Sequence, residues 1–211
     1  MSAKTTGKDG RPLVLASTSP YRRALLERLG IPFTVEAPGI NEMPRPGEAP
    51  RDIALRLAEA KARAVASRLP DAIVIGSDQV AECGGDPVGK PGSRERAVRQ
   101  LESLSGRTVV FHTGLAVVAA GRCQRELIDV TSTFRTLSRP EIDNYLDREQ
   151  PFDCAGSVKA EALGIVLFER IANDDPTALI GLPLIALVRM LRTEGMDVLR
   201  STAAANLGAT E

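Results

Sequence analysis

Residues 72–79, which read Ala-Ile-Val-Ile-Gly-Ser-Asp-Gln, constrain the fold more than any other stretch of this chain. The unbroken apolar run that opens the stretch predicts a short strand buried on both faces, as in the sheet of an α/β protein. Gly76 and Ser77 then bring turn chemistry, and Asp78 brings a carboxylate to the expected end of the strand. Open α/β sheets bind ligands outside the carboxyl ends of their strands, so Asp78 is a candidate site residue. The alternative is an acid that only caps the following turn.

The length and the charge of the chain indicate how many domains it forms and which partners its overall charge can attract. The 211 residues are 43% hydrophobic, which is enough for one sizeable core. We expect a single domain over residues 12–199, between disordered tails at residues 1–11 and 200–211. Lys plus Arg and Asp plus Glu number 27 each, so no overall field attracts DNA, RNA or an anionic membrane. Any anion site must therefore be local.

Signals for export and for metal clusters are missing from the sequence. No apolar run reaches the roughly 18 residues of a membrane span, and the polar N-terminus lacks the apolar region of a signal peptide. Cys83, Cys123 and Cys154 are odd in number and far apart, which fits neither a zinc site nor a disulfide framework. A reducing cytoplasm is the expected location.

The start of a helix is expected directly after the first strand. Ser19 is a suitable N-cap, and Pro20 is a suitable first helical residue. Arg22 and Arg23 follow in the first turn, where the helix dipole disfavours cations. The hydroxyl of Ser17, the helix N-terminus and the two arginines together predict an anion site, with phosphate as the natural anion. A pair of surface arginines is the alternative.

Three more charged residues are candidates for the same site. Glu42 lies in a Pro/Gly-rich loop at residues 37–50, and loops of this length are often functional, although a solvated acid is the alternative. Lys61 follows Leu57 by four residues, beside the apolar face of the next helix, and it either extends outward or reaches a phosphate. Lys90 lies in a tight Gly-Lys-Pro loop that does not fit a Walker A motif but offers a point charge.

The rest of the chain alternates between strand and helix patterns, which predicts an α/β fold. We expect further strands at residues 13–16, 33–36, 108–119, 123–133 and 164–169, and helices at residues 20–29, 51–69, 93–104 and 183–194. A capping box at Ser138 opens one more helix, and a hairpin turns at residues 84–86. His112 is the only histidine, and its place in a strand indicates a structural residue. Acid–base chemistry therefore falls to carboxylates.

Five short motifs occur in order at residues 15–23, 76–79, 89–91, 155–157 and 181–184. Together they resemble the Maf family of nucleotide pyrophosphatases, and the resemblance covers residues 13–199. It implies a mixed twisted sheet with flanking helices and two lobes around a cleft, similar to inosine triphosphatases. It also implies hydrolysis of a nucleoside triphosphate to the monophosphate and pyrophosphate, with a divalent cation such as Mg, Mn or Co.

The resemblance also assigns roles to individual residues. It makes Asp78 the proton acceptor. It places five side chains around the phosphates and the metal: Ser17, Arg22, Glu42, Lys61 and Lys90. The identity and the ligands of the metal stay open. Asn41 stands where the family usually has Asp, and metal binding is weaker here if that Asp tunes it.

Tyr21, Gln79 and Glu161 occupy three positions that distinguish branches of the family. The branch that prefers thymidine and uridine triphosphates typically has Arg, Thr and Gln there, whereas this set resembles the branch that acts on 7-methyl-GTP. A methylated guanine carries positive charge, which favours an aromatic face and a carboxylate. The expected function is therefore removal of modified nucleotides by hydrolysis of 7-methyl-GTP. The alternatives are a dTTP/UTP pyrophosphatase and a nucleotide-binding regulator of cell division without turnover.

The reaction can also be derived from the residues without the family. Release of pyrophosphate requires a water activated against the α-phosphorus, and an aspartate alone is a weak base. A metal that acidifies the water, or burial of Asp78, would help. Arg22, Arg23, Lys61 and Lys90 could stabilise the leaving pyrophosphate. The expected partner is a small nucleotide, and a homodimer is left open.

Overall fold

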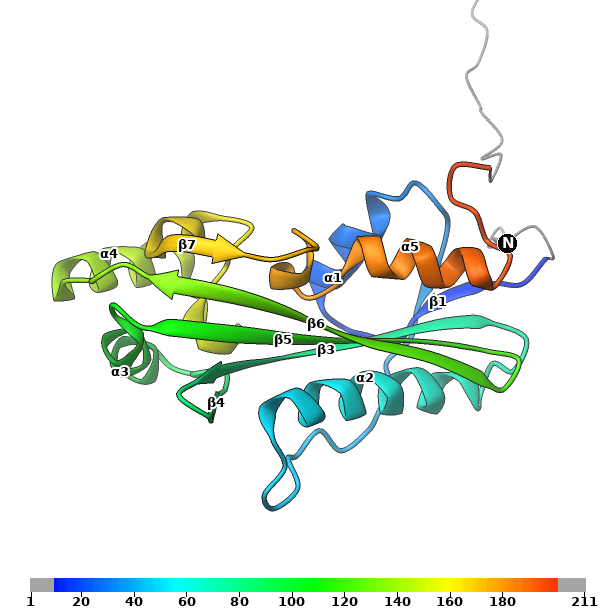
Figure 1. Ribbon diagram of the computed structural model, residues 1–211, viewed down its shortest axis with the longest axis horizontal. Helices are drawn as coiled ribbons and strands as arrows, with labels where there is room; N and C mark the ends of the chain where they lie inside the picture. Colours follow the sequence, from blue (N-terminus) through cyan, green and yellow to red (C-terminus); the bar gives the residue numbers. More distant parts are fainter. Residues whose placement is uncertain (1–9, 201–211) are drawn as a thin grey trace, which may run out of the picture.

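One mixed, twisted sheet of seven strands runs through the computed structural model, which describes residues 10–200 (Figure 1). The strands are β1 (Leu13–Leu15), β2 (Thr34–Val35), β3 (Ile73–Cys83), β4 (Asp86–Val88), β5 (Thr108–Ala119), β6 (Arg122–Phe134) and β7 (Phe168–Ala172). Their order is β2-β1-β3-β5-β6-β7, and β4 pairs with β3. Strand β1 is parallel to β2 and β3, and the other pairs are antiparallel. The expected terminal tails lie almost wholly outside the described residues.

Five α-helices of the described part of the chain flank this sheet. They are α1 (Pro20–Glu27), α2 (Pro50–Ala66), α3 (Arg94–Leu104), α4 (Arg139–Glu149) and α5 (Leu184–Thr193). Helix α2 covers one face, α1 and α5 cover the other, and α3 and α4 lie at the far end of the long strands (Figure 1). Among residues 10–200, no helix is long and apolar enough to cross a membrane.

The helix starts that the sequence predicts are confirmed. The Oγ of Ser19 accepts the N–H of Arg22 at 3.4 Å, and Ser93 caps α3 in the same way. Ser138 and Glu141 form the complete capping box at α4. Each cap satisfies backbone N–H groups that a helix leaves unpaired, so these short polar signals fix where the helices begin.

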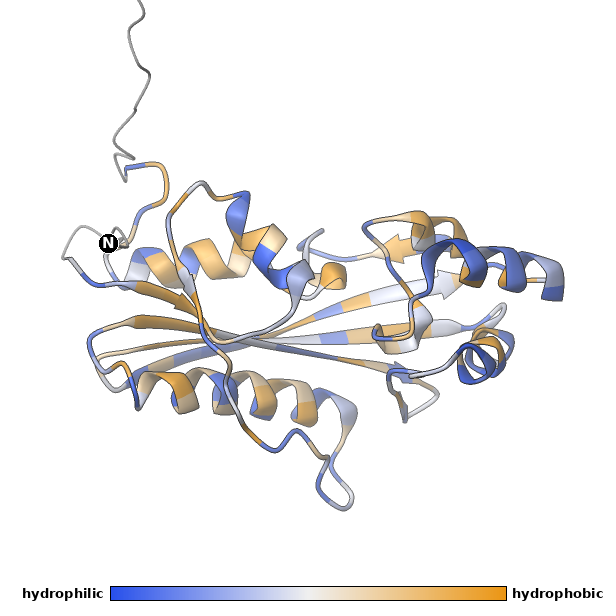
Figure 2. Cartoon of the chain, turned by 180° about the vertical axis from the view of Figure 1, so that it is seen from behind, coloured by the Kyte–Doolittle hydropathy of each residue, from blue (hydrophilic) through white to orange (hydrophobic). Residues whose placement is uncertain are grey.

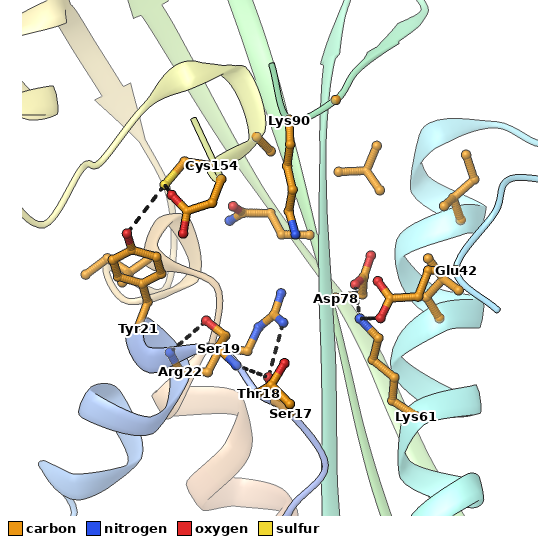
Figure 3. Close-up of a pocket in the computed structure, with 18 of the residues that line it drawn as sticks. Ser17, Thr18, Ser19, Tyr21, Arg22, Glu42, Lys61, Asp78, Lys90 and Cys154 are labelled. Carbon is orange, nitrogen blue, oxygen red and sulfur yellow. Dashed lines mark hydrogen bonds and ion pairs between the residues drawn. The ribbon is translucent and has the colours of Figure 1, made fainter. Parts of the chain in front are cut away.

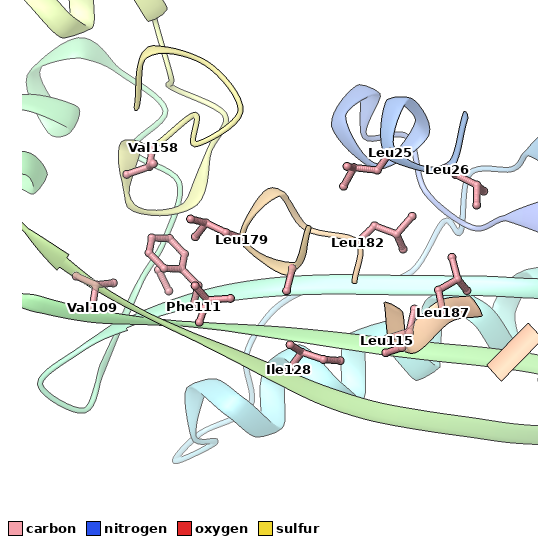
Figure 4. Close-up of a cluster of buried hydrophobic side chains, with 14 of the residues drawn as sticks. Leu25, Leu26, Val109, Phe111, Leu115, Ile128, Val158, Leu179, Leu182 and Leu187 are labelled. Carbon is pink, nitrogen blue, oxygen red and sulfur yellow. The ribbon is translucent and has the colours of Figure 1, made fainter. Parts of the chain in front are cut away.

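The core consists of two layers, one on each face of the sheet. Ile73 and Ile75 of β3 belong to the larger layer under α1 and α5, whereas Val74 belongs to the smaller layer under α2. This alternation confirms that the first part of β3 is buried on both faces. Figure 4 shows the larger layer, where Leu25 and Leu187 lie over the sheet. Figure 2 shows that α4, by contrast, is largely hydrophilic.

Helix α2 approaches the sheet so closely that two strand positions have no room for a side chain. A Cβ on Gly76 would lie 2.2 Å from the carbonyl oxygen of Ala58, and a Cβ on Gly114 would lie 2.3 Å from that of Ala54. Ala54, Ala58 and Ala62 repeat every four residues, so a stripe of small side chains faces the two glycines. The close approach fixes the height of α2 above the middle of β3.

Replacing Gly76 with Ala is expected to lower the free energy of unfolding by about 1–3 kcal/mol, because the added methyl group forces α2 away from the sheet. Urea denaturation measures the effect. Gly89→Ala is the matched control, since nothing lies within 4 Å of a Cβ there and its φ is outside the left-handed region. Equal stability of the two variants would contradict the close packing of α2.

Two strand boundaries differ from the sequence-based expectation. Strand β3 does not end before Gly76 but continues to Cys83, so Asp78 lies in the middle of a long strand. The reason is tertiary, because β5 pairs with β3 from Val74 to Glu82 and places Gly114 opposite Asp78. The strand expected at residues 164–169 was also misplaced, since residues 163–167 form a 3-10 helix before β7.

Candidate functional site

A pocket of about 490 Å³ lies where the end of β1, the start of α1, helix α2 and the middle of β3 meet (Figure 3). The predicted site residues that line it are Ser17, Tyr21, Arg22, Glu42, Lys61, Asp78, Gln79, Lys90 and Glu161. Arg23 does not line the pocket. The structure therefore brings together residues from six separate stretches of the sequence.

Asp78 and Lys61 form a buried ion pair at one wall of the pocket. The Lys61 Nζ lies 2.6 Å from Asp78 Oδ1, and only 5% and 10% of the two side chains are exposed. The same Nζ lies 3.0 Å from Glu42 Oε1, so the ammonium group stands between two carboxylates (Figure 3). Lys61 therefore points into the pocket and does not extend outward to solvent.

Arg22 lies at the opposite wall, in the first turn of α1. Its Nε donates to the carbonyl oxygen of Gly181 at 2.9 Å, and its Nη1 lies 3.5 Å from Ser17 Oγ. Burial lowers the pKa of Arg22, against the opposing influence of Asp78 and Glu42. Arg22 makes no ion pair with a carboxylate of the described residues, so its charge is left for an anion in the pocket.

Arg23 and Lys90 differ in what they offer to a ligand. Arg23 points away from the pocket, and its Nε pairs with Glu27 Oε1 at 2.9 Å on the exposed side of α1. Lys90 extends into the pocket from the loop after β4 (Figure 3). Within residues 10–200, Lys90 has neither an ion pair nor a hydrogen bond through its side chain, so its ammonium group is available.

Tyr21, Cys154 and Glu161 form another part of the pocket wall. Cys154 Sγ lies 3.8 Å from the Tyr21 hydroxyl, and burial raises the pKa of both groups, that of Cys154 to about 12. The pKa of Glu161 is also raised, first by burial and then by the nearby carboxylates of Glu149 and Asp153. A positively charged ligand at this end would oppose that shift and favour the ionised Glu161.

Gln79 is held in one orientation by the backbone around it. Its Nε2 lies 2.9 Å from the carbonyl oxygen of Ala178, 3.0 Å from that of Leu179, and 3.0 Å from Thr113 Oγ1. Carbonyl oxygens only accept hydrogen bonds, so the amide nitrogen of Gln79, which is a donor, must face them. The amide oxygen accepts no hydrogen bond from a described residue, and it is the atom that Gln79 can present to a ligand.

Comparison with known proteins places this chain in a family. The model of the Maf family, described as Maf-like protein, matches residues 12–194. This chain belongs to the Maf family. A protein of Polaromonas sp. named "7-methyl-GTP pyrophosphatase" is 60% identical over 188 residues, which cover 88% of this chain and 86% of the relative. Relatives of the same name in Albidiferax ferrireducens (54%; 90% and 96% covered) and Bordetella parapertussis (57%; 89% and 94% covered) are also similar.

The pocket of this Maf protein fits a divalent cation only when a nucleotide supplies further ligands. No group of three or more His, Cys, Asp or Glu residues within the described part of the chain could hold a metal ion. Glu42 and Asp78 nevertheless share one cation, the Lys61 ammonium group. Two carboxylates completed by phosphate oxygens and water are the usual surroundings of Mg²⁺. Asn41 does not line the pocket, and its Oδ1 accepts the N–H of Met43 at 3.0 Å.

Several residues of the site could not be found from the sequence as functional. Cys154 and Leu179 line the pocket, and the carbonyl oxygen of Gly181 holds Arg22. The motif at residues 181–184 was the only signal for this last contact, because a backbone carbonyl leaves no mark on residue type. His112 lies outside the pocket lining, between Glu82 Oε2 at 2.9 Å and Asp129 Oδ1 at 2.7 Å.

Proposed function

We propose that this chain hydrolyses 7-methyl-GTP to 7-methyl-GMP and pyrophosphate, and so removes a modified nucleotide. The observation that carries the proposal is the arrangement of side chains in one pocket. Buried Asp78 faces Arg22 and Lys90 in one part of the pocket, and Tyr21 and Glu161 line another part. The names of relatives at 54–60% identity support the same substrate.

The triphosphate binds near the N-terminus of α1. Backbone N–H groups there and the Arg22 guanidinium group suit phosphate oxygens, and Lys90 adds a flexible positive charge. Four carboxylates and three cations line the pocket, so the protein alone does not balance the charge of a triphosphate. Glu42 and Asp78 would hold a divalent cation, which when bound supplies positive charge and acidifies the attacking water.

Asp78 acts as the general base. It accepts a proton from the water whose oxygen forms a bond to the α-phosphorus, while the bond from that phosphorus to the bridging oxygen of the β-phosphate breaks. The electron pair leaves with pyrophosphate, and Arg22 and Lys90 stabilise the charge that develops there. Lys61 Nζ lies 2.6 Å from Asp78 Oδ1 and holds the carboxylate in place.

Tyr21, Gln79 and Glu161 select the base. Tyr21 stacks on the cationic purine, and Glu161 neutralises its charge. The amide oxygen of Gln79, whose nitrogen is bound to the turn at Ala178, accepts a hydrogen bond from the guanine N1–H or amine. Uracil and thymine present carbonyl oxygens to the same carboxylate, which repels them.

Product and substrate analysis tests this function. With wild type, ion chromatography should detect pyrophosphate and 7-methyl-GMP, and kcat/KM should be highest for 7-methyl-GTP among 7-methyl-GTP, GTP, dTTP and UTP. Glu161→Gln and Tyr21→Arg should lower the preference for 7-methyl-GTP over UTP, the latter by roughly 2- to 30-fold for a lost cation–π contact. Release of orthophosphate would overturn the reaction, whereas a preference for dTTP or UTP would overturn only the substrate.

The proposal also covers the lobes of the fold, the cellular compartment and the oligomeric state. We infer that the pocket is the cleft between two lobes of an inosine triphosphatase-like fold, supported by the elements that meet there. The described cysteines are all free thiols, which supports a reducing cytoplasm as the compartment. We also propose that the chain forms a homodimer, and light scattering would measure the mass of the particle in solution.

A further inference from the structure

One short turn, residues 178–181, holds the residue that faces the phosphates. The carbonyl oxygen of Gly181 accepts hydrogen bonds from Arg22 Nε at 2.9 Å and from Ser77 Oγ at 2.8 Å. Gly181 has a φ of 113°, and a Cβ there would lie 3.4 Å from Arg22 Nε. The turn therefore sets the position of the guanidinium group relative to β3.

The same turn holds the residue that faces the base. The carbonyl oxygen of Ala178 accepts from Gln79 Nε2 and from Thr113 Oγ1, both at 2.9 Å, and the carbonyl oxygen of Leu179 accepts from Gln79 Nε2. These contacts lie two and three residues from the Arg22 contact along the chain. A displacement of this turn would consequently move both Arg22 and Gln79.

Asp175 closes the base of this turn, away from the pocket. Its Oδ1 accepts the N–H and the hydroxyl of Thr177 at 3.1 and 2.7 Å. Its Oδ2 accepts the N–H groups of Ile185 and Ala186, at 2.8 and 3.3 Å, at the start of α5. Asp175 is only 3% exposed and does not line the pocket. One buried carboxylate thus joins the two ends of the loop between residues 177 and 185 through four donors.

We propose that Asp175 is a positioning residue that aligns Arg22 and Gln79 together through the turn at residues 178–181. A carboxylate suits this position because all four groups that hydrogen-bond to it are donors, and the helix dipole of α5 adds to the attraction. Asp175→Asn would aim an amide N–H₂ at these donors, which repels them and loosens the turn. The proposal rests on the nucleotide site proposed above, and it assigns to Asp175 an effect on both ends of the ligand.

The test measures binding at each end separately, without turnover. Calorimetry gives two dissociation constants. The constant for inorganic pyrophosphate reports on the position of Arg22, and the constant for 7-methyl-GMP reports on the contact between Gln79 and the base. For Asp175→Asn we expect both constants to rise by about 10-fold or more, because misplacement by about 1 Å is costly in such sites. A wild type that binds both ligands but does not hydrolyse 7-methyl-GTP would overturn the reaction and leave this inference standing.

Glu194→Gln is the matched control. Glu194 is another buried carboxylate, 5% exposed, at the opposite end of α5, and it accepts from Arg122 Nη2 at 3.0 Å and Gln124 Nε2 at 2.9 Å. The control should lower the melting temperature without changing either dissociation constant. If Asp175→Asn does the same, or changes only one constant, the proposal is wrong.

Thr177→Val provides a milder variant in case Asp175→Asn does not fold. The Thr177 hydroxyl lies between Asp175 Oδ1, at 2.7 Å, and the N–H of Leu184, at 2.8 Å. Replacing the hydroxyl with a methyl group removes both of these hydrogen bonds and keeps the side-chain volume. Both dissociation constants should rise again, and wild-type values for both would contradict the positioning role.

Discussion

Asp78→Asn is expected to lower kcat for 7-methyl-GTP by about 10²–10⁴-fold, the usual contribution of a general base. The amide keeps the shape of the carboxylate but cannot accept the proton of the attacking water. Lys61 keeps a partner in this variant, because its Nζ also lies 3.0 Å from Glu42 Oε1. Nucleotide binding should therefore persist, and single-turnover kinetics with calorimetry separates the two quantities.

Glu82→Gln is the control for this experiment. Glu82 lies on the same strand as Asp78 and, four residues further, on the same face, but it binds His112 and does not line the pocket. The control should keep wild-type kcat. A near-normal kcat for Asp78→Asn would favour Glu42 as the base if turnover still depends on Glu42. If the wild type itself shows no turnover of any of the nucleotides, a regulator that only binds nucleotides becomes the better interpretation.

Arg22→Ala is expected to lower kcat/KM by about 10²–10³-fold, as for the loss of one preorganised donor to a developing negative charge. Its guanidinium group has no carboxylate partner among the described residues and is oriented by Gly181. Pyrophosphate should also become a weaker product inhibitor, because the proposed mechanism places Arg22 against the leaving group. Steady-state kinetics and inhibition constants measure both effects.

The neighbouring arginine gives this prediction a close control. Arg23 carries the same charge one residue along α1, yet it points outward to Glu27. Arg28 is the C-cap residue of α1 and does not line the pocket either. Arg23→Ala and Arg28→Ala should retain most activity. Equal losses for Arg22→Ala and Arg23→Ala would mean that the overall charge of α1 matters, and that no phosphate lies at its N-terminus.

Local sequence signals predicted much of the scaffold. The caps at Ser19, Ser93 and Ser138 act over three residues, so the sequence alone marks where these helices begin. The same local reasoning ended the central strand too early, because Gly76 looked like a turn residue. Its real constraint is the backbone of α2, 18 residues earlier at Ala58, which no local pattern reveals.

The sequence by itself determined the family, the α/β class and the residue types of the pocket, because five short motifs lie in a fixed order. Only the tertiary structure decided how these residues face each other. It turned Arg22 inward and Arg23 outward, and it placed Lys61 between Glu42 and Asp78. In the folded chain, the backbone carbonyl groups of residues 178 and 179 also fix the orientation of the Gln79 amide. Carbonyl groups are the same in every residue, so their role depends on where the folded chain brings them.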